Sequence, residues 1–141
     1  MKVLVDTNVI LDVLLKRDGL YAESFEVFRS VEQHIITGCV TSSAITDIFY
    51  LVHRAQKNIT MVYQAVDALA ALFTIAPVSE RTIKSALALR WKDFEDAVQY
   101  STAKENEVDC IVTRNKDDYT ASDIPCVSPA DFPAFYKSAG P

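Results

Sequence analysis

The sequence predicts an α/β protein in which helices cover both faces of a parallel sheet, and three observations support this. Short apolar runs (KVLV, IITGCV, DCIV) alternate with longer segments of helical periodicity. These runs are too apolar for strands with one solvated face. The chain has 141 residues, is 50% hydrophobic and shows no linker-like stretch. We therefore expect one domain over residues 1–141, with residues 136–141 as a loose tail.

The first strand, residues 2–5, ends at Asp6, Thr7 and Asn8, which are all good helix N-cap residues. A helix over residues 9–17 is expected to follow directly, until Gly19 stops it. Phe25, Phe28 and Val31 are spaced for one face of a helix over residues 21–33.

The other elements follow from the same periodicities. Hydroxyl residues end the strand at 35–43, Ser79 is a capping candidate for the helix at 79–91, and polar residues end the strand at 109–115. The expected elements after residue 34 are strand 35–43, helix 43–56, helix 61–73, strand 74–78, helix 79–91, helix 92–106, strand 109–115, strand 124–129 and helix 131–136.

Composition limits the class of protein. No apolar run reaches the roughly 18 to 20 residues that span a bilayer, and Asp6 and Asp12 interrupt the apolar N-terminus, which argues against a signal sequence. The odd number of cysteines, 3, without CxxC spacing, is typical of buried thiols in a reducing compartment, so we expect a cytoplasmic protein. A net charge of -5 argues against a broadly basic nucleic-acid-binding surface but leaves room for local basic patches.

Polar and acidic residues follow the strands, where open α/β sheets bind their ligands. Asp6 follows the first strand, and Asn115 is the last of the polar residues that end the strand at 109–115. Asp47 lies about one turn into its helix and Asp96 in the first turn of another, and both helices begin at the same edge. Carboxylates brought this close repel one another unless a cation joins them. Hard oxygen ligands suit Mg²⁺ or Mn²⁺, which typically bridge a phosphate, so phosphoryl-transfer chemistry is the natural hypothesis.

Each of these residues also has a purely structural interpretation. Asp6 and Asp93 are suitable helix caps, and Asp47 suits a solvent-facing helix position. Asn115 and Asp118 suit turns. The functional interpretation depends on the combination of acids at strand ends rather than on any one of them.

Three stretches in this order resemble the PIN-domain nucleases, especially the VapC-like toxins of bacterial toxin–antitoxin modules. They are LVDTNVILD, DFEDAVQ and IVTRNKDDY, and the resemblance spans residues 1 to about 128. It implies an α/β/α sandwich around a parallel sheet, a carboxylate cluster that binds Mg²⁺ or Mn²⁺, and hydrolysis of RNA.

On this resemblance, Asp6 and Asp96 are the first-choice metal ligands. Asp47 takes the position of a second acid that is usually Glu in the family, so its shorter side chain is a departure. Asn115 stands where many members carry Asp, and Asp118 is the residue that would supply the missing charge. The notable consequence is that two of the expected catalytic positions, Asp47 and Asn115, are altered.

Other residues are given supporting roles by the same match. Thr7 and Thr113 are candidates for hydrogen bonds to the ligands, Asp93 is a cap or outer partner, and Glu95 is expected to be solvated. The candidates for holding the RNA backbone are Arg114, Lys116, Lys92 and Arg90. Water, oriented by an acid or by Asn115, would attack the phosphate without a side-chain nucleophile.

The resemblance further implies a small antitoxin partner, and homodimers are common in such families. The IFYLV segment, residues 48–52, is either part of a buried core helix or a partner groove. A PIN-fold binding module without turnover is the main alternative function, favoured by Asp47 and Asn115. A phosphoacceptor receiver domain is less suitable because VDTN has a single acid, and a dinucleotide-binding domain because no Gly-rich loop follows a strand.

Overall fold

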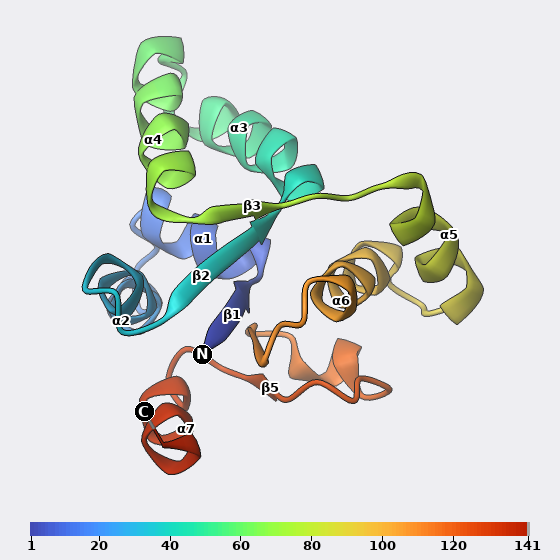
Figure 1. Cartoon of the computed structure of the whole chain (residues 1–141). Coiled ribbons are helices and arrows are strands. Elements are labelled where there is room, and N and C mark those ends of the chain that lie inside the picture. Colours follow the sequence, from blue (N-terminus) through green and yellow to red (C-terminus); the bar gives the residue numbers. More distant parts are fainter. Residues whose placement is uncertain (141) are drawn as a thin grey trace.

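The computed structural model describes residues 1–140 and contains a five-stranded sheet whose neighbouring strands are all parallel. The strand order is β3-β2-β1-β4-β5, so β1 lies in the middle (Figure 1). The strands are β1 Lys2–Val5, β2 Thr37–Thr41, β3 Thr74–Ala76, β4 Cys110–Val112 and β5 Cys126–Val127. The helices are α1 Thr7–Leu14, α2 Tyr21–Glu32, α3 Ser42–Gln56, α4 Ile59–Leu72, α5 Glu80–Leu89, α6 Phe94–Glu105 and α7 Phe132–Ala139, with a 3₁₀ helix η1 at Lys116–Tyr119.

Helices cover both faces of the sheet, because successive strand residues point to opposite sides. Val3 and Val5 belong to the core that the sheet shares with α1, α2, α3, α4 and α7. Leu4, between them, belongs to a second core with α6 and η1. Figure 1 shows α5 and α6 on the side of the sheet away from α1 and α2. The predicted three-layer α/β/α sandwich is therefore confirmed.

The connection from β1 to α1 is as direct as the sequence predicts, but the helix is displaced toward the N-terminus. Asp6 has an extended backbone at the N-cap position, yet its carboxylate makes no capping hydrogen bond. The helix ends at Leu14 rather than at residue 17. Beyond it Lys16 has a φ of 47° and the Arg17 amide donates to the carbonyl of Asp12, so the chain turns back before Gly19.

Strand β2 is shorter than the predicted 35–43. Thr41, its last residue, pairs with Ala76 of β3 and is also the N-cap of the following helix. Its side chain accepts a hydrogen bond from the Ala44 amide at 3.2 Å, and α3 begins at Ser42. Gly38 of β2 lies against the helical layer, where an added Cβ would come within 2.6 Å of Val31 Cγ2. Glycine is thus required there for close packing.

The second half of the chain confirms two predicted caps and corrects several bounds. Ser79 caps α5 and Asp93 caps α6 through the Asp96 amide. The strands predicted at 74–78, 109–115 and 124–129 are each confined to 2 or 3 residues, since their polar and proline-containing ends form loops. The predicted loose tail is wrong for residues 136–139, which continue α7, and Pro141 lies outside the described residues.

The carboxyl ends of β1, β2 and β4 lead into α1, α3 and the loop before η1, and α6 begins near the same edge. This edge therefore collects the ends of elements that are far apart in sequence. Among residues 1–140, no helix has the length and apolar character needed to cross a membrane.

Candidate metal centre

A cleft of about 340 Å³ lies at this edge of the sheet, and its walls carry most of the acids that the sequence singles out. The residues that line it are Asp6, Thr7, Asn8, Leu11, Asp47, Tyr50, Leu51, Asp93, Glu95, Asp96 and Asn115. They come from β1 and α1, from α3, from α6 and from the loop after β4. The structure thus brings the predicted acids together.

Asp6 is held in the floor of the cleft by two neutral donors. Thr113 Oγ1 donates to its Oδ2 at 2.7 Å, and Gln99 Nε2 donates to its Oδ1 at 3.3 Å. The side chain is buried, and burial raises the pKa of Asp6, although the Thr113 hydrogen bond acts in the opposite direction. Thr113 and Gln99 are both neutral, so they do not balance the negative charge of the carboxylate, and a cation could still bind it.

The supporting threonines predicted from the sequence lie beside Asp6. Thr113 Oγ1, besides donating to Asp6, accepts a hydrogen bond from the Asn115 amide at 3.0 Å. Thr7 Oγ1 accepts from Gln99 Nε2 at 3.4 Å. Thr113 therefore joins the carboxylate on β1 to the loop that presents Asn115.

Asp96 has fewer hydrogen-bond donors to its carboxylate than Asp6, the other buried acid of the cleft. It is buried; the Tyr119 hydroxyl donates to its Oδ1 at 3.1 Å, while its Oδ2 has no hydrogen-bond partner. Burial, followed by the charges of Asp6 and Asp93, raises the pKa of Asp96 to about 7. A buried carboxylate oxygen without a partner, among like charges, is a suitable ligand atom for a cation.

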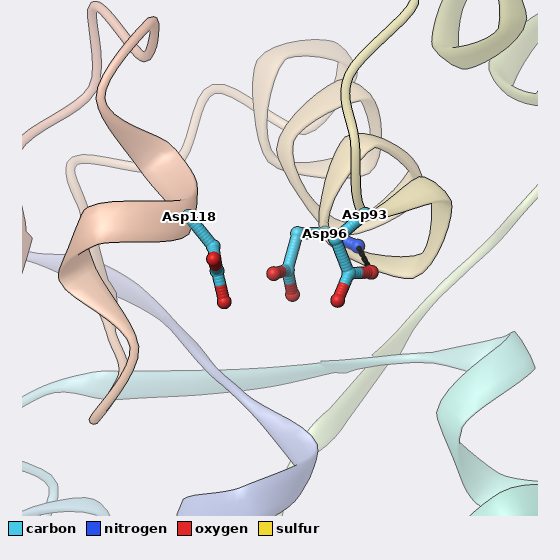
Figure 2. Close-up of side chains that lie close together, drawn as sticks. All are labelled: Asp93, Asp96 and Asp118. Carbon is cyan, nitrogen blue, oxygen red and sulfur yellow. Dashed lines mark hydrogen bonds between the residues drawn. The ribbon is translucent and has the colours of Figure 1, made fainter.

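Asp93 and Asp118 flank Asp96 (Figure 2). One carboxylate oxygen from each of the three lies within 4.8 Å of the others. Asp93 Oδ1 also accepts the Asp96 amide at 3.2 Å, so the residue caps α6 and faces the cluster at once. Both sequence interpretations of Asp93, as a cap and as a partner of the site, are thus compatible with its position.

Asp47 and Asn115 line the cleft from α3 and from the loop after β4, and Asp47 is exposed. Glu95, expected to be solvated, is exposed but also faces this cleft. Partial desolvation at the wall of the cleft, followed by the charges of Asp6, Asp47 and Asp93, raises the pKa of Glu95. Glu95 is therefore a member of the acidic set that the sequence analysis missed.

Gln99 and Tyr119 were missed as well. Gln99 is the last residue of DFEDAVQ and lies three positions after Asp96, on the same face of α6, which was a usable signal. Tyr119 follows Asp118 directly, but nothing in the local sequence indicates that its hydroxyl reaches α6. Burial, followed by the charges of Asp6 and Asp96, raises the pKa of Tyr119, so the hydroxyl keeps its proton and donates.

The basic candidates are placed unequally. Arg114 Nη2 donates to the buried Asp12 Oδ1 at 3.1 Å, and Lys116 Nζ lies 3.5 Å from Asp131 Oδ2. Lys92 is exposed beside Asp93 and Asp118, and Arg90 is exposed at the end of α5. Lys92 thus lines a pocket together with Asp93 and Asp118 and has no ion pair among residues 1–140.

The donor set fits a hard divalent cation. The groups that converge are carboxylates with one amide, and the described residues of the cleft include no histidine or cysteine. Oxygen donors of this kind suit Mg²⁺ or Mn²⁺ rather than zinc. Burial first, and repulsion among the acids after it, raise the pKa values of Asp6, Glu95 and Asp96, and a cation would relieve that repulsion.

Comparison with known proteins agrees with this arrangement. The family model described as PIN domain matches residues 2–117, which contain all the acids that line the cleft and end just before Asp118. Ribonuclease VapC1 of Aquifex aeolicus (strain VF5) is 25% identical over 136 residues, which cover 93% of this chain and 92% of that protein.

Solved structures also share the fold, among them a chain of a toxin–antitoxin complex and a toxin. A chain of a toxin–antitoxin complex from Klebsiella pneumoniae superposes with a TM-score of 0.66 and 20% identity, covering 90% of this chain and 97% of that one. Mycobacterium tuberculosis VapC20, described as a sarcin–ricin loop cleaving toxin, superposes with a TM-score of 0.65 and 14% identity, covering 84% of this chain and 94% of that one. At these identities the likeness concerns the fold alone.

Proposed function

The chain belongs to the PIN-domain family, and from this premise we propose that it is a Mg²⁺- or Mn²⁺-dependent endoribonuclease, the toxin of a toxin–antitoxin pair. The similarity to ribonuclease VapC1 along nearly the whole chain supports the reaction class. The fold shared with a sarcin–ricin loop cleaving toxin supports RNA as the substrate.

The observation that carries the proposal is the unpartnered Oδ2 of Asp96 in a cleft with several other acids. Leaving buried polar atoms unsatisfied and like charges together is costly unless a ligand completes the site. A divalent cation satisfies both conditions, and a phosphodiester is the substrate class that such cations bridge.

The residues that would hold the cation are Asp6 and Asp96, with Asp47 across the cleft. Asp118 lies near Asp96 and supplies the charge that Asn115, at the fourth position, does not. A bound cation would polarise the scissile phosphate and make water a better nucleophile. Asn115 and the acids would orient a water for in-line attack on phosphorus, which breaks the P–O3′ bond and leaves 5′-phosphate and 3′-hydroxyl ends.

The RNA backbone would be held by basic side chains around the acidic cleft. Lys92 and Arg90 are exposed at the α5–α6 connection, beside Asp93. Lys116 and Arg114 lie on the loop after β4, but each is already paired with an acid. Affinity for RNA should consequently fall as salt rises, with Lys92 contributing most freely.

The proposed biological unit is a single cytoplasmic domain that a small antitoxin inhibits. A structure that shares this fold is part of a toxin–antitoxin complex, which supports a partner of that kind. Homodimerisation, common in such families, belongs to the same proposal.

The second candidate is a PIN-fold binding module that no longer turns over its ligand. Two observations favour it: Asp47 is an exposed, short acid and Asn115 carries no charge. Such a module would bind divalent cations weakly, because the number of charged ligands determines the affinity of these sites. Cation binding therefore separates the two functions.

The test is calorimetric titration of the chain with Mn²⁺ and Mg²⁺, followed on the same samples by incubation with a mixed RNA pool. In the Asp6→Asn/Asp96→Asn variant we expect cation binding at least about 100-fold weaker, since changes to outer partners alone cost 10- to 100-fold. Cleavage should be lost together with binding.

The matched control is Asp18→Asn/Asp67→Asn, which changes the net charge equally at exposed positions away from the cleft. It should bind and cleave as the wild type does. Cleavage by the double cleft variant would refute the assignment of ligands, and a wild-type chain that binds neither ion would favour the inactive module.

A further inference from the structure

Tyr119 is a buried tyrosine whose hydroxyl contacts a proposed metal ligand. It is 2% exposed, and its hydroxyl donates to Asp96 Oδ1 at 3.1 Å, across 23 residues of sequence. The same carboxylate has its other oxygen, Oδ2, unpartnered. The hydroxyl thus occupies one oxygen of Asp96 and leaves the second for a ligand.

The ring of Tyr119 is anchored independently of this hydrogen bond. It packs in the core formed by Leu4, Ile111 and Ile124, and edge-on against Trp91 at a centroid distance of 6.0 Å. A phenol placed in such a core must find a partner for its hydroxyl. Its rigid position makes it a fixed donor for the α6 carboxylate.

Tyr119 also ends the 3₁₀ helix η1 that carries Asp118. The Asp118 amide donates to the Asn115 carbonyl at 3.0 Å. This backbone hydrogen bond and the buried ring of Tyr119 together hold the turn in place. Asp118 is itself exposed, and its carboxylate comes within 4.8 Å of those of Asp93 and Asp96. The hydrogen bond from Tyr119 to Asp96 therefore links η1, which carries the proposed ligand Asp118, to α6, which carries the proposed ligand Asp96.

We propose that Tyr119 is a positioning residue for the cation: its hydroxyl fixes Asp96 with Oδ2 free and keeps the turn of Asp118 beside it. The inference rests on the proposed function, because it assumes that Asp96 and Asp118 ligate a divalent ion. It goes beyond that function because Tyr119, a neutral side chain that would not touch the ion, is given the role of arranging the ligands Asp96 and Asp118.

Without the hydroxyl, both oxygens of Asp96 lack a partner from the chain. The carboxylate is then free to rotate, and the ion must order it on binding, which weakens affinity. Phenylalanine at position 119 keeps the ring in its core and removes only the hydrogen bond, so it isolates this effect.

The experiment is Mn²⁺ calorimetry on the metal-free chain and on Tyr119→Phe, with thermal unfolding of both recorded in the absence of metal. We expect Tyr119→Phe to bind Mn²⁺ about 10-fold more weakly while remaining folded, with its unfolding temperature lowered by no more than the loss of one buried hydrogen bond implies. The control is Tyr100→Phe, since Tyr100 packs against the same Trp91 in a tilted arrangement but donates to the exposed Asp123 at 2.8 Å. It should bind Mn²⁺ as the wild type does.

A second variant tests the link to Asp118. Asp118→Asn should weaken Mn²⁺ binding in the wild-type background, and its additional effect should shrink in Tyr119→Phe, because the turn is no longer tied to Asp96. Equal Mn²⁺ affinity of Tyr119→Phe and the wild type would overturn the inference and leave the proposed function intact. A wild type that binds no Mn²⁺ would overturn both.

Discussion

Asp12 and Asp96 are both buried aspartates on helices that begin at the same edge of the sheet, yet their surroundings differ in charge. Asp12 is fully buried; Arg114 Nε lies 2.9 Å from its Oδ2, and Ser24 Oγ donates to the same oxygen at 2.9 Å. Arg17 Nη1 adds a second positive charge 3.4 Å from Oδ1. Asp96 has only the neutral Tyr119 hydroxyl, and no ion pair among residues 1–140.

The difference separates a structural acid from one arranged for a ligand. Asp12 is neutralised by the chain itself, which ties α1 and α2 to the loop after β4. Asp96 is surrounded by Asp6 and Asp93, which help to raise its pKa to about 7. A buried carboxylate without its counter-charge reduces stability, and such sites cluster where proteins bind or react. The contrast predicts opposite effects for equivalent substitutions.

The largest effect is expected for Asp12→Asn. The substitution removes the shared counter-charge of Arg17 and Arg114, and breaking a buried pair of this kind is strongly destabilising. Because both arginine side chains keep about a third of their exposure and can reach water, we expect a loss of about 2 to 3 kcal/mol in the free energy of unfolding. Urea denaturation, monitored by circular dichroism, measures this loss in the free energy of unfolding.

Asp67→Asn, at an exposed position on α4, is the matched control for this loss. It should change the free energy of unfolding by less than about 0.5 kcal/mol. If Asp12→Asn were as stable as Asp67→Asn, the ion pairs of Asp12 with the two arginines would contribute little to stability. Asp12 could then not be classed as a structural acid.

How far the sequence predicts this contrast depends on the range of each interaction. Asp6 and Asp96 could be placed at one edge because strand direction alone brings the ends of parallel strands together. The partner of Asp12 could not be predicted, since Arg114 is 102 residues away and the contact depends on β1 lying beside β4. The Tyr119 hydrogen bond was missed for the same reason. The helix bounds differ from the predicted ones where such side-chain contacts, rather than local helix propensity, determine where a helix begins or ends.

The second effect concerns pH and belongs to Asp96. In the metal-free chain, folded Asp96 keeps its proton up to a pKa of about 7, whereas an unfolded aspartate loses it near 3.8. The folded state therefore binds more protons between about pH 4 and pH 7, and the free energy of unfolding falls as pH rises through this window. Because the cleft admits water, we expect a fall of about 1 to 2 kcal/mol between pH 5 and pH 8.

Asp96→Asn should flatten this dependence, leaving only the smaller slope that the raised pKa values of Asp6 and Glu95 produce in the same direction. The acids with lowered pKa values, Asp123 and Asp131, act with the opposite sign but below about pH 4, outside the window. Urea denaturation in metal-free buffer at both pH values decides the matter. An unchanged slope in Asp96→Asn would mean that another group carries the extra proton.

The smallest effect distinguishes the basic residues that the two acids leave available. Arg114 is committed to Asp12, whereas Lys92 is exposed beside the acidic cluster. We expect Lys92→Ala to leave the free energy of unfolding unchanged, to weaken binding of single-stranded RNA a few-fold, and to make the dependence of log affinity on log salt shallower by about 0.7.

Arg114→Ala should instead lose stability, because it leaves Asp12 buried with one cation fewer. Fluorescence anisotropy in EDTA, where cleavage is prevented, compares the two variants. A greater loss of RNA affinity in Arg114→Ala, without a loss of stability, would reverse the roles assigned to them.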